Sequence, residues 1–103
     1  MKSSHRAGAS ARTTQRMYAE GKSAEQIAAE RNLAVTTIYG HLYERKVLDP
    51  ETFITQELYE RAEVVYSSKA DDRYLILDSF MTPAAKAAFY FLRRLRYNAE
   101  VKQ

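Results

Sequence analysis

Residues Gly21 to Leu42 read GKSAEQIAAERNLAVTTIYGHL, and this stretch decides the fold. Gly21 lacks a Cβ atom, so it can take the left-handed backbone conformation that ends a helix. Ser23 and Gln26 have the spacing of a capping box, in which each side chain binds the backbone N–H of the other residue. Asn32 tolerates positive φ and suits a turn. The stretch therefore predicts a helix, a tight turn and a further helix.

Apolar residues give these two helices a shared inner face. Ile27 and Ala28 face inward on the first helix, and Ala28 is small enough to let another helix approach closely. Leu33, Ile38 and Leu42 form a second apolar stripe at spacings of five and four. The first spacing crosses the turn, and the second is one helical turn. This pattern is typical of a DNA-binding helix-turn-helix.

The stretch resembles the helix-turn-helix module found near the C-terminus of bacterial RecQ-type ATP-dependent DNA helicases. The resemblance rests on IAAERNL at Ile27–Leu33 and TIYGHL at Thr37–Leu42, and it covers residues 13–48. The family usually has Gly where Asn32 stands, and Ser or Thr where Ala34 stands. Loss of a hydroxyl cap costs about 1 kcal/mol, which weakens the following helix without excluding it. The resemblance implies a role in DNA repair and recombination, as a fragment of a longer helicase.

Composition favours one small domain. The 103 residues, 46% of them hydrophobic, suffice for a single modest core. No run of 18 apolar residues and no signal-peptide core are present, so no membrane contact is expected. The absence of cysteine fits a cytoplasmic location. His5 and His41 are far apart and belong to no ligand motif, so neither a metal nor another cofactor is predicted.

The charge is distributed unevenly along the chain. Residues 1–48 carry eight basic and four acidic residues, residues 49–80 carry three and eight, and residues 81–103 carry five and one. The two outer segments are therefore basic and the middle one is acidic. This distribution is compatible with a phosphate-attracting face beside a repelling one, and equally with chance segregation of solubilising charges.

The sequence predicts an all-α fold, in which a tri-helical helix-turn-helix is followed by two or three further helices in a compact bundle. Residues 1–12 are expected to form a flexible basic arm or linker, residues 13–48 the helix-turn-helix, and residues 49–103 a helical extension packed on it. The helices are predicted at 13–20, 24–31, 35–46, from Asp49-Pro50 to Tyr66, at 69–81, and from Thr82-Pro83 to Asn98. Residues 74–77 alone are also compatible with a short buried strand.

The predicted DNA contacts lie at the start of the second helix and on the outer face of the third. They are Lys22, Ser23, Thr36, Thr37, Tyr39, Gly40, Tyr43 and Lys46. A helix N-terminus and hydroxyl groups suit phosphate, and a glycine on an outer face admits close approach of the DNA backbone. No Arg, Asn or Gln stands at the front of the third helix to read a base bidentately. Backbone contact with duplex, forked or single-stranded DNA is therefore favoured over sequence-specific readout.

The last helix offers a possible second basic patch at Arg93, Arg94 and Arg96. Cations near a helix C-terminus also interact favourably with the helix dipole, which is the alternative explanation. The aromatic residues of this segment, Phe89, Tyr90, Phe91 and Tyr97, are more than one helix face needs. Packing in the core is the default interpretation, and any of these rings that lie at the surface would mark a partner surface.

The sequence contains no constellation for catalysis, such as a glycine-rich phosphate loop or a nucleophile paired with a base. The chain itself is therefore not predicted to be an enzyme, even where its parent is an ATP-dependent helicase. The favoured function is a DNA-binding accessory domain of such a helicase. The alternatives are a protein-docking module, for example for the catalytic core of the parent, and a helix-turn-helix transcriptional regulator.

Overall fold

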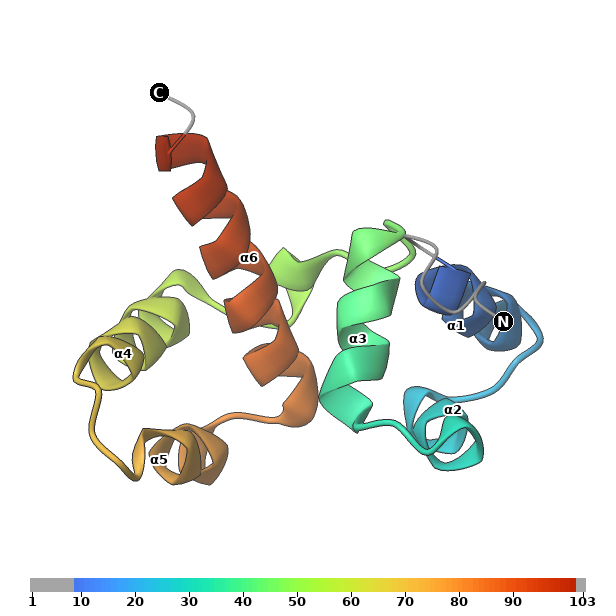
Figure 1. Ribbon diagram of the computed structural model, residues 1–103, viewed down its shortest axis with the longest axis horizontal. Coiled ribbons are helices and arrows are strands. Elements are labelled where there is room, and N and C mark those ends of the chain that lie inside the picture. The colour runs from blue at the N-terminus through green and yellow to red at the C-terminus, as the bar shows by residue number, and fades with distance from the viewer. Residues whose placement is uncertain (1–8, 102–103) are drawn as a thin grey trace. The chain divides into compact units, whose positions relative to one another are not determined.

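The computed structural model describes residues 9–101, and this part of the chain is helical without any strand. Figure 1 shows the elements in chain order. They are α1 (Ala9–Ala19), α2 (Ala24–Arg31), α3 (Val35–Glu44), a 3₁₀ turn η2 (Pro50–Thr52), α4 (Gln56–Ser67), α5 (Arg73–Phe80) and α6 (Pro83–Val101). The predicted all-α class is confirmed. The chain divides into two compact units, Met1–Asp49 and Pro50–Gln103.

The first unit is a tri-helical helix-turn-helix with a small apolar core. Its buried residues are Met17, Ala24, Ile27, Ala28, Ile38 and Leu42. The predicted inner faces of α2 and α3 are thereby confirmed. Leu33 is the exception, because it lies in the turn and its side chain is 36% exposed. That the second unit packs on this one stays a prediction.

Each helix of the first unit ends in the same backbone arrangement, a left-handed residue in a Schellman motif. Gly21 has φ of 100°, Asn32 of 56° and Lys46 of 61°. After α2, for example, the Leu33 N–H donates to the Ala28 carbonyl at 2.9 Å and the Asn32 N–H to the Ala29 carbonyl at 3.3 Å. These bonds satisfy carbonyls that would otherwise lack partners at the helix end. The predicted roles of Gly21 and Asn32 as stops are confirmed.

The two helix starts around the turn differ. At α2 the predicted capping box is present: Gln26 N–H donates to Ser23 Oγ at 3.0 Å, and Ser23 N–H donates to Gln26 Oε1 at 2.9 Å. At α3 the capping residue is Ala34, which has the extended backbone of an N-cap but no side chain to accept a hydrogen bond. The first turn of α3 is therefore less well satisfied than that of α2.

Helix α1 begins at Ala9, four residues earlier than predicted. Residues 9–12 are thus helical, whereas they were expected to belong to a flexible arm; the rest of that arm lies outside the described residues. Two observations explain the early start. Ala11 is buried, and Arg31 donates to the carbonyl and the hydroxyl oxygen of Ser10 at 3.0 and 2.9 Å. These contacts hold the first turn of α1 in place.

In the second unit, the prediction that a long helix begins at Asp49-Pro50 is wrong. Pro50 opens only the 3₁₀ turn η2, which is closed by a 3.0 Å bond from Phe53 N–H to the Pro50 carbonyl. Helix α4 begins at Gln56, because the extended Thr55 accepts the Leu58 N–H at 3.1 Å as a true N-cap. Thr55 is therefore the cap that starts α4.

The remaining helices follow the prediction more closely. Residues 73–80 form α5, so the helical alternative for this segment is confirmed over the strand. Helix α6 begins at Pro83, with Thr82 Oγ1 accepting the Ala85 N–H at 3.1 Å, and it continues to Val101 rather than Asn98. An ion pair between Asp78 and Lys86 joins α5 to α6.

Aromatic side chains form much of the core of the second unit. Phe89 is fully buried, and its ring lies 5.2 Å from that of Tyr59 and 5.9 Å from that of Tyr66. Leu95 is 50% exposed, and Tyr97 is 62% exposed. The apolar face of α6 thus ends before the helix does.

We predict that Asn32→Ala lowers the free energy of unfolding by about 1 kcal/mol, because a Cβ-bearing residue without a polar side chain is strained at positive φ. Asn32→Gly should stay within about 0.5 kcal/mol of wild type, since glycine takes this conformation without strain. Urea denaturation measures both variants. Equal stabilities for the two variants would show that the turn does not depend on this backbone conformation.

Restoring the missing cap should stabilise the protein. Ala34→Ser supplies a hydroxyl oxygen that can accept an N–H in the first turn of α3, and we expect about 1 kcal/mol of added stability in thermal or urea unfolding. The control is Ala29→Ser, the same change at an exposed position inside α2. It should be neutral or slightly destabilising, because serine is a poorer helix former than alanine. A gain in both variants, or in neither, would contradict the role of Ala34 as an N-cap.

Candidate nucleic-acid interface

The N-terminal half of α3 presents its outer face to solvent. Thr37 is exposed, Thr36 and Gly40 are partly exposed, and Ile38 on the inner side is fully buried. A Cβ atom built on Gly40 would meet no atom within 4 Å outside its chain neighbours and the helix's own backbone. The Tyr43 side chain therefore does not crowd this position, so the glycine leaves an open patch of helix surface.

A buried polar contact fixes α3 against the other two helices. Thr14 of α1 is completely buried, and its Oγ1 atom lies 2.7 Å from Nδ1 of His41 on α3. Arg31 at the end of α2 donates to the same oxygen through Nη1. One hydroxyl group thus joins all three helices. Sequence reasoning missed this contact.

The bonds of Thr14 are compatible with a neutral His41. Arginine can only donate, so the Thr14 oxygen accepts from Arg31. The Thr14 hydroxyl hydrogen can be donated to Nδ1 of His41 in the tautomer that carries the ring hydrogen on Nε2. Burial lowers the pKa of His41, and the nearby Arg31 cation lowers it further, while Glu44 acts in the opposite direction. The neutral imidazole is therefore the form that fits this site.

Two tyrosines were predicted to contact DNA from the outer face of α3. For Tyr43 the predicted exposure is wrong. Its side chain is only 1% exposed, and burial is the main cause that raises its pKa. Tyr39 is partly buried against the apolar core, and its ring stacks on that of Tyr43 at 6.3 Å. Burial, and then the charge of Glu25, raise the pKa of Tyr39, so its hydroxyl keeps its proton at neutral pH.

Some of the basic and hydroxyl side chains that were predicted to contact DNA have partners within the protein. Lys22 forms an ion pair with Glu30 at 3.2 Å, and Ser23 Oγ accepts the Gln26 N–H. Lys46 is exposed but lies beyond the end of α3, in the left-handed turn that terminates it. Neighbouring Arg45 is exposed and donates through Nε to Gln15 at 2.9 Å.

Acidic residues also reduce the part of the α3 surface that a DNA phosphate can approach. Glu44 is exposed on α3 one helical turn after Gly40, and Glu25 is exposed in the first turn of α2. Both would repel phosphate. The open part of the face is therefore confined to the start of α3, around Thr36, Thr37 and Gly40.

The three arginines of the predicted second patch do not form one uniform surface. Arg93 donates through Nε to Glu63 at 2.9 Å and lies over the Tyr66 ring at 4.7 Å, so its charge is already paired. Arg96 lies over the Tyr59 ring at 4.2 Å. Arg94 is exposed, with its guanidinium 5.7 Å from the Phe91 ring centre. Stacking on aromatic rings, which sequence reasoning missed, is what these arginines share.

Within the part of the chain that the structure describes, no group of three His, Cys, Asp or Glu side chains is placed to hold a metal ion. Among the same residues no helix is long and apolar enough to cross a membrane.

Comparison with known proteins identifies the family. A family model described as a helix-turn-helix domain matches residues 10–87. The chain belongs to the helix-turn-helix domain family. No curated protein and no solved structure gives a match. Helix-turn-helix domains in general bind DNA, with the helix after the turn entering the groove, and in this chain that helix is α3.

The state of His41 predicts a pH dependence of stability. The unfolded chain binds this proton with a pKa of about 6.5, whereas the folded pKa is lower, so below about pH 6.5 the unfolded state binds more protons. The free energy of unfolding should therefore fall as the pH is lowered below about 6.5. Above that pH the contribution of the neutral His41 to stability is complete. Urea denaturation at several pH values between about 5 and 8 measures the effect.

His41→Gln should reduce this pH dependence, whatever it does to stability at neutral pH. His5→Gln is the matched control, because it removes the other histidine of the chain. We expect the control to keep the wild-type profile. Identical profiles for His41→Gln and wild type would show that His41 is not held in the neutral form.

Proposed function

We propose that this helix-turn-helix domain binds duplex or forked DNA through the start of α3, with low sequence specificity. The observation that carries the proposal is the open surface at Gly40, where no side chain outside the immediate chain neighbours comes within 4 Å of a built Cβ. Glycine is unfavourable inside a helix by about 1 kcal/mol relative to alanine. Close approach of a sugar-phosphate backbone accounts for its presence on an otherwise ordinary helix.

The side chains around Gly40 support backbone contact. Thr36 and Thr37 can donate hydroxyl hydrogens to phosphate oxygens, and Ser23 at the start of α2 can do the same while it accepts its capping bond. Lys46 adds an exposed cation at the other end of α3. None of these residues reads a base bidentately, and Glu44 opposes deep insertion of the helix. Low sequence specificity follows from this set of side chains.

We further propose that the domain is an accessory part of an ATP-dependent DNA helicase of the RecQ type, acting in repair and recombination. The support is the resemblance at residues 13–48, whereas the family match supports the helix-turn-helix domain alone. A helicase makes sequence-independent contacts along its substrate, so it needs the kind of interface that α3 offers. A transcriptional regulator would need base-reading side chains, which the front of α3 lacks.

Docking to the catalytic core of the parent helicase is a second candidate function. It is favoured by α5, where Tyr74, Leu75 and Ile76 are exposed next to one another. Such a run of apolar surface is typical of a protein contact. Replacing Leu75 by Asp should abolish an association between the isolated ATPase core and this domain, and it should leave DNA binding by α3 unchanged.

The sharpest test of DNA binding is Gly40→Ala. We predict that this variant is more stable than wild type by about 1 kcal/mol in urea denaturation, because alanine favours the helix and its methyl group meets open space. We also predict that its affinity for duplex DNA falls about tenfold, or roughly 1.4 kcal/mol, because the methyl group blocks backbone approach. Fluorescence anisotropy with a labelled duplex at two salt concentrations measures the affinity.

Thr37→Ala serves as the companion variant, since it removes an exposed hydroxyl without adding bulk. It should weaken duplex binding with little change in stability. Wild-type binding should weaken as salt is raised, as phosphate contacts require. If Gly40→Ala gains stability and keeps full DNA affinity, α3 does not approach DNA at this point and the proposal fails.

A further inference from the structure

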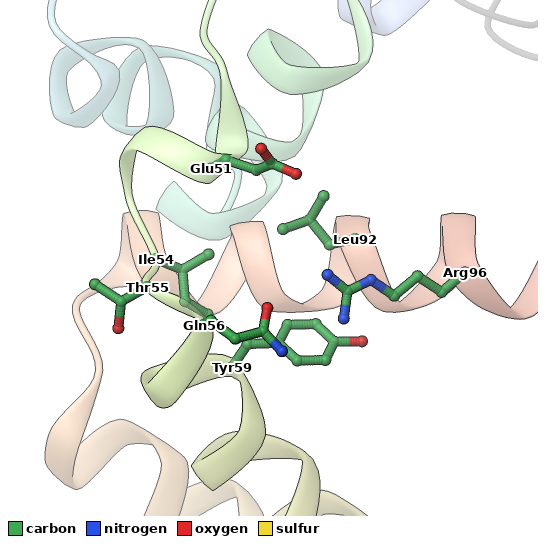
Figure 2. A pocket seen from close by; sticks show the side chains of 7 residues that line it. All are labelled: Glu51, Ile54, Thr55, Gln56, Tyr59, Leu92 and Arg96. Atoms are coloured by element: carbon green, nitrogen blue, oxygen red, sulfur yellow. The ribbon is translucent and has the colours of Figure 1, made fainter.

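A cavity of about 310 Å³ lies within the second unit, between the start of α4 and the middle of α6. Figure 2 shows Arg96 extending from α6 toward the Tyr59 ring, with Gln56 beside that ring and Leu92 on the side of Glu51. The lining thus combines apolar side chains with a guanidinium group, an amide and a carboxylate. An apolar surface with a few polar groups is the usual make-up of a small binding site.

The Arg96 guanidinium lies over the Tyr59 ring at 4.2 Å. Among the side chains that the structure describes, no carboxylate forms an ion pair with it. Arg93, one helical turn earlier, lies in the same way over Tyr66 but is paired with Glu63 at 2.9 Å. Within the described part of the chain, Arg96 is thus the one of these two arginines whose charge is not paired by a carboxylate.

The position of Arg96 over the ring suits an anion that accepts two hydrogen bonds. A guanidinium beside an aromatic ring can still donate the N–H groups along its edge, which match the oxygens of a phosphate or carboxylate. Arg96 is exposed, so these N–H groups are accessible to a ligand.

An adjoining cavity of about 190 Å³ shares Tyr59 and Arg96 and adds Tyr97. The Tyr97 side chain is 62% exposed, so the faces of its ring are accessible. Exposed tyrosines next to arginines are typical of surfaces on which unpaired bases stack while the backbone meets the cations. A base inside a duplex cannot stack on a protein ring in this way, so the arrangement favours a single strand.

The charge of α6 favours the same ligand. Helix α6 contains Lys86, three arginines and one acidic residue, Glu100. Glu51 lines the larger cavity, and Glu63, which is paired with Arg93, lines the smaller one. The excess of cations on α6 favours a polyanion such as nucleic acid.

We propose that the second unit holds a binding site for single-stranded nucleic acid, in which Arg96 binds a backbone phosphate and Tyr97 stacks on an adjacent base. This site extends the proposed function. It rests on that function, because both take nucleic acid as the ligand. At a fork, α3 would contact the duplex arm and the Arg96 site the unpaired arm.

The test uses the full chain and a short fluorescein-labelled oligothymidylate in anisotropy titrations. Arg96→Ala should weaken binding about tenfold, as loss of a charge-assisted phosphate contact requires. The matched control is Arg94→Ala, which removes the same charge from an exposed position on the same helix that lines neither cavity. It should weaken binding by less than about twofold, through the general field alone.

Two further variants separate the site from unfolding. Arg96→Lys keeps the charge and should recover only part of the affinity, because lysine lacks the planar fork. Tyr97→Ala changes an exposed ring, so the fold should be retained, and it should also weaken binding. Equal losses in Arg94→Ala and Arg96→Ala, or no loss in either, would overturn the proposal.

Further titrations fix the ligand class and separate the two proposals. A poly-glutamate peptide should not displace the oligothymidylate; Arg96-dependent displacement would show a site for acidic protein segments and overturn the nucleic-acid assignment. Arg96→Ala should leave duplex affinity unchanged, and Gly40→Ala should leave oligothymidylate affinity unchanged. Failure of wild type to bind duplex, with Arg96-dependent binding of the single strand retained, would refute the role of α3 alone.

Discussion

The buried hydroxyl of Thr14 is the contact on which the geometry of the helix-turn-helix depends. It bonds to His41 of α3 at 2.7 Å and accepts from Arg31 of α2, so three helices converge on one oxygen atom. Removal of one partner would leave polar groups unsatisfied in a buried place, which costs more than the bond itself contributes. The apolar core brings the helices together, and this contact adds hydrogen bonds that join all three of them. Ile38 of α3 is buried in that core, so Thr37 and Gly40 lie toward solvent.

The two surfaces that we propose for nucleic acid differ in their physical basis. On α3, Gly40 leaves the helix backbone accessible, and the nearby acidic residues limit the accessible area. On α6, the exposed guanidinium of Arg96 lies over the Tyr59 ring. The first surface suits the regular backbone of a duplex, and the second suits an unpaired nucleotide.

Local signals in the sequence predicted the local structure well. The capping box at Ser23, the left-handed turn at Asn32 and the start of α6 at Pro83 each depend on residues within one helical turn of one another. The start of α4 was missed because Asp49 and Thr55 both resemble caps, and only packing chooses between them. Contacts across long separations, such as Thr14 with His41 at 27 residues, leave no periodic signal. For the same reason the burial of Tyr43 could not be deduced from the helix alone.

The most direct test of the account is to map the DNA contact on the ¹⁵N-labelled chain by NMR, titrating a duplex and following backbone amide shifts. The account predicts that the largest changes fall at Thr36, Thr37 and Gly40 and at the start of α2, and that the amides of α5 do not move. Shifts concentrated on α5, or a saturable duplex interaction that leaves the start of α3 unchanged, would contradict it.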